Sequence, residues 1–562
     1  NNQIVIELLK YHGIKKIVIS PGATNVSLVA SIQNDSFFEL YSSVDESIIS
    51  TLNHMLFKDN CYQYESGGNP ENITDLSYEQ FIATHKKFYH PSNARIWLDG
   101  TMNIDEVLKF MDEEYLNNYT RAEFDFTIPM QKPVESETVR FAYEASEEEG
   151  TEHRTHVAYA KIVSRFDDMK KNLAWQVLSS ILVANNESPL KKAVLENNLG
   201  EDVELELFDG IQQPWAVLVV RNTDEAKIDQ VKETVLSTVK ELVEKGLNHD
   251  QISATLNQME FRYREKHEPA GLMYGQRAMA AWLYDGDPAQ NLSIGYLFDE
   301  LRSAVNDGYY ENLLKEFLLE DDYVTAVAVP SLTLGKARDE KETAKLHEWK
   351  ENLSDPEYYI ELNRKLDEWQ ATPDTEEQLA TLPHLKLSDI SDKPFTIACD
   401  ETAVRGVPVY LHPTENSGIV YMNLYFSLAG VTVKDLPSVA FYSSLFMNLR
   451  TKSHTLEELQ QLVRKDLGSL SFFVDAYTPT GEKDACIPVL GITCSVLKEK
   501  VNSAVALINE VIHETVFDKD AILPLLKQDN EDFRQNLIAN GHAIAARRVS
   551  AHYCAEGVFK EY

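Results

Sequence analysis

The sequence is poor in cysteine and has no long apolar run. Over 562 residues the cysteines are scattered, and no two of them form a CxxC pair. They are Cys61, Cys399, Cys486, Cys494 and Cys554. An odd, scattered set is typical of a reducing compartment, so we expect a cytoplasmic protein without a disulfide framework. No apolar run approaches the roughly 18 residues that a membrane span needs. The first residues, NNQIVIELLKYHG, lack the basic start and the cleavage site of a signal peptide.

Positive charge is also scarce. The chain has 53 Lys and Arg against 89 Asp and Glu, which gives a net charge of −36 at neutral pH. Such a surface repels phosphate backbones and anionic lipids, so we expect neither nucleic acid nor membrane as a main partner. It would attract basic peptides, although solubility alone also explains an acidic surface. A serine-hydrolase function is not expected, because no GxSxG motif occurs.

One order of predicted elements occurs twice. Residues 154–245 predict a strand, two helices (167–185 and 187–198), two strands, and a long helix from Asp224 to Lys245. The same order returns in residues 417–515. A second pattern also recurs, because residues 78–100 and 310–330 each predict a helix, a break and a strand, in similar lettering. The sequence therefore predicts an α+β fold made of repeated sheet-plus-helices domains.

These repeats predict the domain organisation. We expect the back half of a first unit in residues 47–125, a whole second unit in 139–330, and a truncated third unit in 395–562. Between the last two, the charged segment 335–390 carries Leu at helical spacing and predicts a long helical hairpin used as a connector. Residues 1–46 predict a short βαβ-like piece with strands in 15–20 and 37–43.

Three segments carry a resemblance to a known family. They are ESGGNPENITDLSYEQFIATHKKFYHPSNARIWLDGTM (65–102), FRYREKHEPAGLMYGQRAMAAWLYDGDP (261–288) and NGHAIAARRVSAHY (540–553). In this order they resemble the pitrilysin/insulinase-type zinc metallopeptidases, in their presequence-protease (peptidasome) branch, over about residues 45–562. The resemblance implies four homologous α+β domains in two half-shells, joined by a helical hairpin, that enclose and degrade unfolded peptides.

The same resemblance implies roles for single residues. An Arg and a Tyr of this family contact the substrate backbone, and here they would be Arg548 and Tyr553, with Arg547 as the other candidate for the Arg. An Arg fork and a phenol could orient a carbonyl and stabilise its oxyanion. A surface arginine pair on a helix explains the same letters equally well.

The zinc motif of this family, HxxEH, is not found among the 15 histidines. In that motif two His on one helix face bind the metal, and the Glu acts as general base on the zinc-bound water. The nearest string, HTLEE (454–458), has Glu in place of the second His, and SVAFY (438–442) stands where the third unit would carry the metal helix. His85 and His90 point to different helix faces, and His153 and His156 fit a solvated acidic loop better than a metal site. We therefore expect no zinc on this chain alone.

Residues 1–47 carry a second, unrelated resemblance. HGIKKIVISPGATN and FFELYSSVDE are similar to the start of the thiamine-diphosphate-dependent menaquinone-pathway synthases of 2-succinyl-5-enolpyruvyl-6-hydroxy-3-cyclohexene-1-carboxylate. The resemblance implies that Glu46 contacts the aminopyrimidine ring of the cofactor. The cofactor's Mg²⁺ also needs a GDG-type motif with Asn ligands. Neither FDGI (208–211) nor YDGDP (284–288) is followed by them.

Three functions remain open at this stage. The first is a zinc-dependent endopeptidase of unfolded oligopeptides, inactive unless another chain supplies the HxxEH half. The second is a non-catalytic peptide-binding module, and the third, weaker alternative is the thiamine-diphosphate synthase. The two resemblances overlap between Ser42 and Ser47, where we place a join of two pieces. Either a natural fusion or an artefact of the gene sequence would explain the join.

Overall fold

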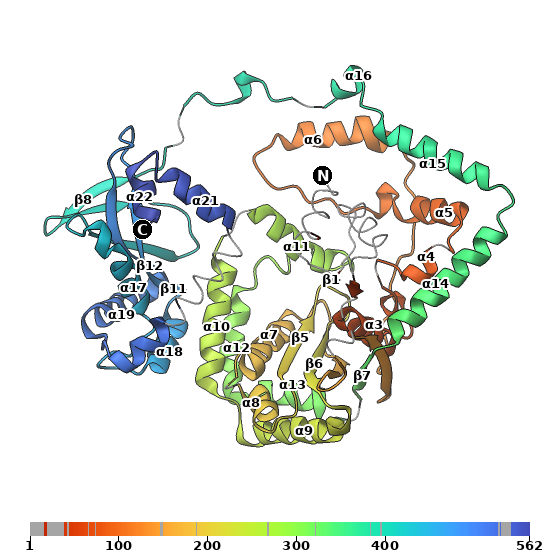
Figure 1. The fold of residues 1–562 in the computed structure, drawn as a ribbon, viewed down its shortest axis with the longest axis horizontal. Helices are drawn as coiled ribbons and strands as arrows, with labels where there is room; N and C mark the ends of the chain where they lie inside the picture. Colours follow the sequence, from red (N-terminus) through yellow and green to blue (C-terminus); the bar gives the residue numbers. More distant parts are fainter. Residues whose placement is uncertain are drawn as a thin grey trace. The chain divides into compact units, whose positions relative to one another are not determined.

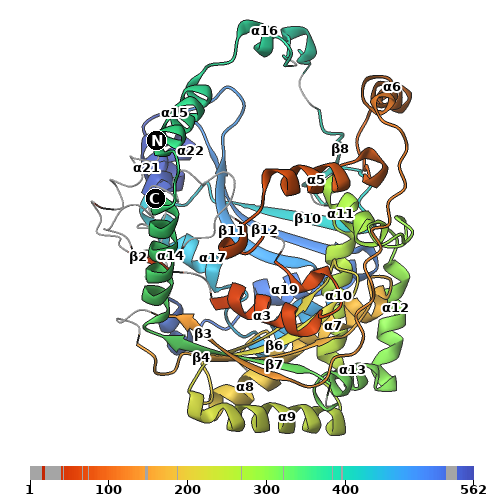
Figure 2. The ribbon, with the colours of Figure 1, turned by 90° about the vertical axis from the view of Figure 1, so that its right-hand side faces the viewer.

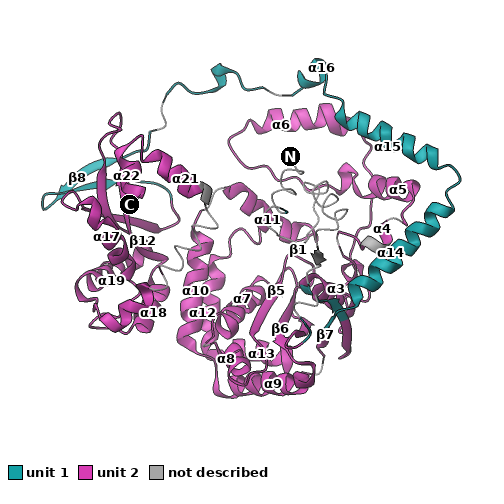
Figure 3. Cartoon of the chain, in the orientation of Figure 1, with its two compact units in different colours: residues 1–44, 142–151, 329–415 teal, residues 45–141, 152–328, 416–562 magenta. Residues whose placement is uncertain are grey.

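The computed structural model describes most of the chain and divides it into two compact units. It describes Lys10, residues 16–18 and 39–41, and residues 44–561 except 66, 74, 146–149, 187, 267–268, 321, 383, 394–395, 527–528 and 530–540. Figure 3 colours the units: one contains residues 1–44, 142–151 and 329–415, and the other contains residues 45–141, 152–328 and 416–562. These units cut across the domain bounds proposed above, which stay a prediction.

A five-stranded sheet forms the largest core of the second unit (Figure 1). Its strand order is β3-β7-β4-β6-β5, and the strands are β3 (Thr138–Glu144), β4 (Thr155–Ile162), β5 (Asp202–Phe208), β6 (Trp215–Thr223) and β7 (Val324–Ser331). β4 pairs antiparallel with both β6 and β7. The first six residues of β4 are all buried, which explains its near-continuous apolar lettering THVAYA.

Helices pack around this sheet. They are α7 (Met169–Val183), α8 (Pro189–Glu196), α9 (Ile228–Lys245), α10 (His249–Arg264), α11 (Ala270–Trp282), α12 (Gly295–Ser303) and α13 (Tyr309–Leu318). Buried aromatic side chains join the layers, since Trp175 of α7 and Phe317 of α13 meet edge to face with ring centroids 5.3 Å apart. The two helices, two strands and long helix predicted in 154–245 are confirmed in type and order.

A second sheet, of three strands, repeats part of this topology (Figure 2). Its order is β10-β12-β11, with β10 (Ile419–Ser427), β11 (Ser469–Tyr477) and β12 (Ile487–Leu497), and both pairs are antiparallel. Helices α17 (Leu436–Leu445), α18 (Leu456–Asp466) and α19 (Val501–Glu514) surround a core that includes Leu459, Ile492 and Val511. The order β4-β6-β5 thus returns as β10-β12-β11, and the second predicted set of strands and helices is confirmed. Helices α21 (Gly541–Ser550) and α22 (Ala555–Glu561) lie farther along the chain.

Helix α10 connects the two sheets within the second unit. The side-chain amide of Asn257 donates to the carbonyl oxygen of Lys465 at 3.0 Å, and the Tyr421 hydroxyl donates to Glu265 at 3.1 Å. Gly468 lies under the ring of Phe261 so closely that a Cβ added there would stand 2.1 to 2.4 Å from three ring carbons. Only glycine allows this approach of backbone to ring.

Residues 44–119 are largely helical, but one predicted strand does not form. The helices are α3 (Val44–Leu56), α4 (Pro70–Ile73), α5 (Tyr78–Phe88) and α6 (Ile104–Phe110). Ser77 and Gln80 cap the start of α5 reciprocally, as its sequence S-x-x-Q predicts. The prediction of a strand before Gly100 is wrong, because residues 94–99 have no regular structure. A strand needs a neighbour for its backbone hydrogen bonds, and no described segment pairs with these residues.

The first unit contains the connector predicted between the repeats. Helices α14 (Leu334–Glu351) and α15 (Pro356–Ala371) form a pair in which Trp349 meets Tyr359 edge to face at 5.6 Å. The predicted hairpin is thus confirmed for these two helices, and the described residues from there to 390 add the short α16 (Glu376–Leu379) and a 3₁₀ turn. Asp355 caps α15 through the backbone N–H of Tyr358, and Pro356 takes its first position.

The first unit also contains two small strand pairs. β8 (Asp400–Val404) and β9 (Val407–Leu411) form an antiparallel hairpin, and the sequence analysis missed it. Its loop, Arg405–Gly406, has φ of 51° and 83°, as a two-residue hairpin turn requires. β1 (Lys16–Val18) and β2 (Glu39–Tyr41) are parallel, which confirms the two strands of the βαβ-like piece, whereas its helix at 24–32 lies outside the described residues.

Two further findings concern the cysteines and the helices. All five cysteines are described and none is disulfide-bonded. Within the described ranges, no helix combines the length and the apolar character needed to cross a membrane.

The contact of Gly468 with Phe261 gives a stability prediction. Gly468→Ala should lower the free energy of unfolding by about 1–3 kcal/mol, because the ring must shift to admit the methyl group. Gly430→Ala is the matched control, since a Cβ there has open space, and it should change stability by less than about 1 kcal/mol. Thermal and urea unfolding measure both variants. In a Phe261→Ala background the cost of Gly468→Ala should largely disappear, and an undiminished cost would contradict the contact.

Candidate functional site

The three residues that the family resemblance singles out lie on and just after helix α21. The side chains of Arg547 and Arg548 are exposed in its last turn, and Tyr553 is exposed in the turn that follows. We call these three residues the α21 cluster. The structure therefore brings two guanidinium groups and a phenol to one short exposed segment.

The α21 cluster is tied to the second sheet through α22. A guanidinium nitrogen of Arg548 lies 2.6 Å from a carboxylate oxygen of Glu561, the last residue of α22. Helix α22 is itself fixed to β11, because Lys560 lies 3.2 Å from Asp475 and the hydroxyl of Thr478 donates to Glu556 at 2.5 Å. The pair of Arg548 and Glu561 is largely solvent-exposed on the arginine side, so it contributes little stability.

Glu46, the residue implied by the thiamine-diphosphate resemblance, lies in the first turn of α3 with an exposed side chain. The neighbouring Asp45 forms an ion pair with Arg221 at 2.5 Å. Carboxylates in a first turn interact favourably with the helix dipole, which accounts for this pair of acidic residues without a ligand. The two Asp-Gly strings are also used structurally, because Asp285 pairs with Arg95 at 3.1 Å and Asp209 accepts from Gln176 at 3.3 Å.

The histidines of the first repeat take part in aromatic packing. The ring of His85 stacks on Tyr89 with centroids 4.7 Å apart. Nδ1 of His90 accepts from the backbone N–H of Ser92 at 3.1 Å, and its ring meets Tyr119 and Phe124 edge to face. These two imidazoles therefore have separate partners and do not converge on one point.

His153 and His156 occupy opposite environments. His153 is exposed and lies 2.8 Å from Asp224, whereas His156 is buried in β4. Burial, together with the positive charge of Arg221, lowers the pKa of His156 to about 4. The predicted solvated loop therefore describes His153, whereas His156 lies inside strand β4.

The string HTLEE begins helix α18 and is a helix cap. Thr455 and Glu458 form a capping box, in which the Thr455 hydroxyl accepts from the Glu458 backbone N–H at 3.2 Å and the Glu458 carboxylate accepts from the Thr455 N–H at 2.8 Å. His454 lies beside Glu510, with Nδ1 to Oε1 at 2.9 Å. The hydrogen bond with Glu510 raises the pKa of His454 above its usual value.

The residues of this chain do not fit the zinc that the family resemblance implies. The full sequence contains no HxxEH, and SVAFY, within α17, contributes no ligand. Over the ranges that the structure describes, no three His, Cys, Asp or Glu side chains gather closely enough to hold a metal ion. No catalytic step through zinc is therefore assigned to these residues.

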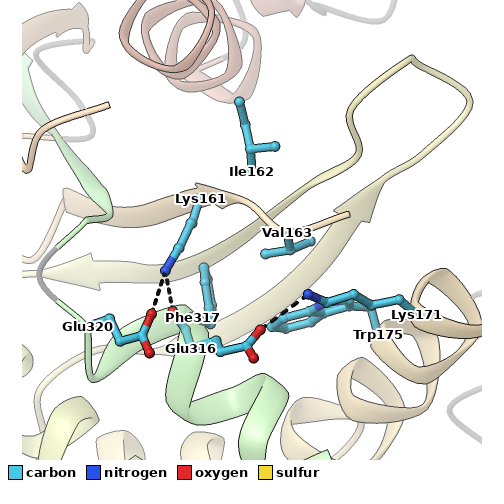
Figure 4. Close-up of a pocket in the computed structure, with 8 residues that line it drawn as sticks. All are labelled: Lys161, Ile162, Val163, Lys171, Trp175, Glu316, Phe317 and Glu320. Atoms are coloured by element: carbon cyan, nitrogen blue, oxygen red, sulfur yellow. Dashed lines mark hydrogen bonds and ion pairs between the residues drawn. The ribbon is translucent and has the colours of Figure 1, made fainter. Parts of the chain in front are cut away.

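One cavity of about 190 Å³ lies between β4, α7 and α13 (Figure 4). Its cations are already paired: Lys161 donates to Asp322 and to the Glu316 carbonyl oxygen, and Lys171 lies 3.2 Å from the Glu316 carboxylate. Since each lysine that lines it has an acidic partner, the cavity offers no unmatched charge to a ligand. We interpret it as a structural gap at the end of β4.

Comparison with known proteins gives two domain matches. Residues 75–259 match the peptidase M16 inactive domain, and residues 329–562 match a domain described as associated with the C subgroup of the M16 peptidases. Together with the presequence-protease relatives below, these matches support assignment of the chain to the pitrilysin/insulinase family of peptidases.

The relatives are longer proteins. The chain is 30% identical over 532 residues to the protein HypA of Clostridium perfringens, covering 93% of this chain and 54% of HypA. It is 26% identical over 529 residues to presequence protease 1, chloroplastic/mitochondrial, of Arabidopsis thaliana, covering 91% of this chain and 49% of that protein. The mouse mitochondrial presequence protease is 25% identical, with 91% and 50% covered. The chain thus spans about half the length of these relatives.

One similar solved structure is the peptidase M16 inactive domain from Pseudomonas fluorescens. It aligns with a TM-score of 0.39 and 18% identity, covering 51% of this chain and 66% of that chain.

The pair of His454 and Glu510 gives a pH prediction. A raised histidine pKa means that the pair stabilises the fold at a pH below the unfolded value of about 6.5, and that this stabilisation is lost as pH rises through the folded pKa. In an NMR titration the His454 ring should therefore titrate above pH 6.5, and Glu510→Gln should lower its midpoint. Glu514→Gln, which removes the partner of Ser453 instead, is the control and should lower it less. An unchanged midpoint in Glu510→Gln would contradict the pair.

Proposed function

We propose that this chain is a non-catalytic, peptide-binding part of a presequence-protease-type zinc metallopeptidase. It binds unfolded oligopeptides and takes part in their cleavage only when an HxxEH-bearing polypeptide acts with it. The proposal rests on two observations taken together, one from the family matches and one from the sequence. Residues 75–259 match a domain described as inactive, and no HxxEH occurs anywhere in the chain.

The α21 cluster is the surface that we propose for peptide contact. Guanidinium forks donate hydrogen bonds to carbonyl or carboxylate oxygens in a fixed planar geometry, and a phenol adds one further donor. An unfolded peptide exposes a carbonyl at every residue, whereas a folded protein pairs most of them internally. Donors grouped at the end of one helix therefore favour an extended chain over a folded surface.

The net charge supports a preference for basic peptides. A chain with a charge of −36 attracts cationic peptides over a distance set by the Debye length, about 8 Å at physiological salt. This attraction accelerates encounter, while the α21 cluster fixes the bound backbone. We expect association to slow as salt is added, with less effect on dissociation.

Fluorescence anisotropy with a labelled, unfolded basic oligopeptide tests binding, and a quenched version of the same peptide tests cleavage. We expect saturable binding without cleavage, at any added zinc concentration. Binding of one zinc per chain with chelator-sensitive cleavage would overturn the non-catalytic assignment. Absence of saturable binding would overturn the peptide-binding assignment.

Arg547→Ala combined with Arg548→Ala should weaken peptide binding about tenfold. Charge-assisted hydrogen bonds are worth roughly 1.5–3 kcal/mol, and a tenfold change corresponds to about 1.4 kcal/mol. Lys240→Ala combined with Lys245→Ala is the matched control, because it removes two exposed cations from α9 and changes the net charge equally. Equal weakening in both pairs would show a general charge effect and contradict a site at α21.

A further inference from the structure

The two arginines of the α21 cluster differ in what holds their side chains. A guanidinium nitrogen of Arg548 lies 2.6 Å from a carboxylate oxygen of Glu561, whose own side chain is only 20% exposed. Arg547 is exposed in the same turn of α21. Of the two arginines, only Arg548 forms an ion pair with a residue that the structure describes. The cluster therefore contains one guanidinium with an anionic neighbour and one without such a neighbour among these residues.

Helices α21 and α22 meet at a close-packed corner (Figure 1). A Cβ added to Gly557 of α22 would stand 2.4 Å from both the carbonyl carbon and the carbonyl oxygen of Ser550, the last residue of α21. This distance is too short for any side chain, so only glycine lets the two helices approach so closely. The N–H of Gly557 also donates to Sγ of Cys554 at 3.3 Å. The corner fixes the direction in which α22 leaves α21.

Helix α22 is attached to the second sheet at both of its ends. Near its start, the backbone N–H of Ala555 donates to the Lys483 carbonyl oxygen at 2.9 Å, in the loop that follows β11. Near its end, Lys560 lies 3.2 Å from Asp475 of β11. Glu561 is the neighbour of Lys560, so its carboxylate is carried by a helix that is fixed at the corner and on the sheet.

A guanidinium that is held in place before a ligand arrives binds it at a lower entropic cost. An arginine side chain has many rotamers and loses much of this freedom when it forms hydrogen bonds to a ligand. The ion pair with Glu561 restricts Arg548 before binding, whereas Arg547 loses its freedom on binding. Arg548 is therefore the better preorganised donor of the two.

Glu561 also affects which acceptor Arg548 can bind. Its carboxylate offsets the charge of the guanidinium at short range, and the net charge of −36 adds to the negative potential. A backbone carbonyl is neutral and accepts a hydrogen bond from the guanidinium without this repulsion, whereas the C-terminal carboxylate of a peptide is repelled by Glu561. The ion pair thus favours a carbonyl within a peptide over its free C-terminus.

We propose that Arg548 holds a backbone carbonyl within the bound peptide, and that Glu561 positions Arg548 for this contact. This assignment rests on peptide binding at the α21 cluster, as proposed above. It selects one of the two candidate arginines, and it makes Glu561 a positioning residue rather than a competitor for the guanidinium. Arg547 then contributes positive charge without a fixed hydrogen bond.

Stopped-flow fluorescence anisotropy of the full chain with the labelled basic oligopeptide tests the positioning role. Glu561→Gln keeps the size of the side chain and removes its charge, so the peptide should dissociate about threefold faster. Glu244→Gln is the matched control, because it removes one exposed carboxylate from an ion pair on α9. It should leave the dissociation rate unchanged, and both variants should associate at the same rate. Unchanged dissociation or tighter binding in Glu561→Gln would overturn the proposal.

A double-mutant cycle separates positioning from a general structural effect. In an Arg548→Ala background, Glu561→Gln should cause no further weakening, because the side chain through which it acts is absent. An equal effect of Glu561→Gln in both backgrounds would show that Glu561 supports the fold rather than Arg548, and the positioning role would be wrong.

Charge-conserving substitutions test the choice of arginine. Arg548→Lys keeps the charge but loses the planar fork, so it should weaken peptide binding at least threefold, and Arg547→Lys should weaken it less. Equal effects of the two lysine variants would overturn the assignment to Arg548, even if the paired alanine variant weakens binding as expected. If the paired alanine variant leaves binding unchanged, the peptide site at α21 is itself wrong and this assignment falls with it.

A change in the peptide tests the acceptor. Amidation of its C-terminus removes the terminal carboxylate, and the amidated peptide should dissociate no faster than the free acid. Faster dissociation of the amide that disappears in Arg548→Lys would show that Arg548 binds the terminal carboxylate, and the proposed contact with an internal carbonyl would be wrong.

Discussion

The pairing of β4 on both of its edges is the interaction on which the second unit depends. β4 bonds to β6 on one side and to β7 on the other, and the residues that it shares with both are buried. A buried strand must satisfy its N–H and C=O groups through its neighbours, because leaving one unpaired costs about 1–3 kcal/mol. Since β7 is remote in sequence from β4, this core forms only when α13 and β7 return to the sheet. Among the described residues, segment 94–98 pairs with no strand and has no regular structure, and β10 pairs only with β12.

Local signals accounted for most of the elements. β11 (Ser469–Tyr477) is one of the strands predicted within residues 417–515, because alternating apolar residues bounded by turns define a strand without reference to its partner. The prediction of a strand at 94–100 was wrong for the opposite reason. The sequence of this segment resembles that of β7, but a strand forms only where a neighbouring strand pairs with it. The hairpin of β8 and β9 was missed although Arg405–Gly406 between two apolar runs is a readable two-residue turn.

In the candidate site, too, some features follow from local sequence signals and others only from tertiary packing. The sequence alone could have predicted that HTLEE begins a helix, because Thr455 followed three residues later by Glu458 is a capping-box pattern. The sequence could not have predicted the partner of His454, because the packing of α18 against α19 brings Glu510 to it. The exposure of Arg547 and Arg548 and the link of Arg548 to Glu561 also follow from tertiary packing, whereas the choice of these arginines came from family resemblance alone.

The acidic surface and the α21 cluster act at different stages of the proposed peptide interaction. A charge of −36 attracts a basic peptide through a screened field, so added salt weakens this attraction. The contacts at α21 are made by guanidinium groups, which donate hydrogen bonds to the carbonyl oxygens of the peptide backbone. The net charge therefore sets how often a basic peptide arrives, whereas the geometry at α21 sets how the peptide is held.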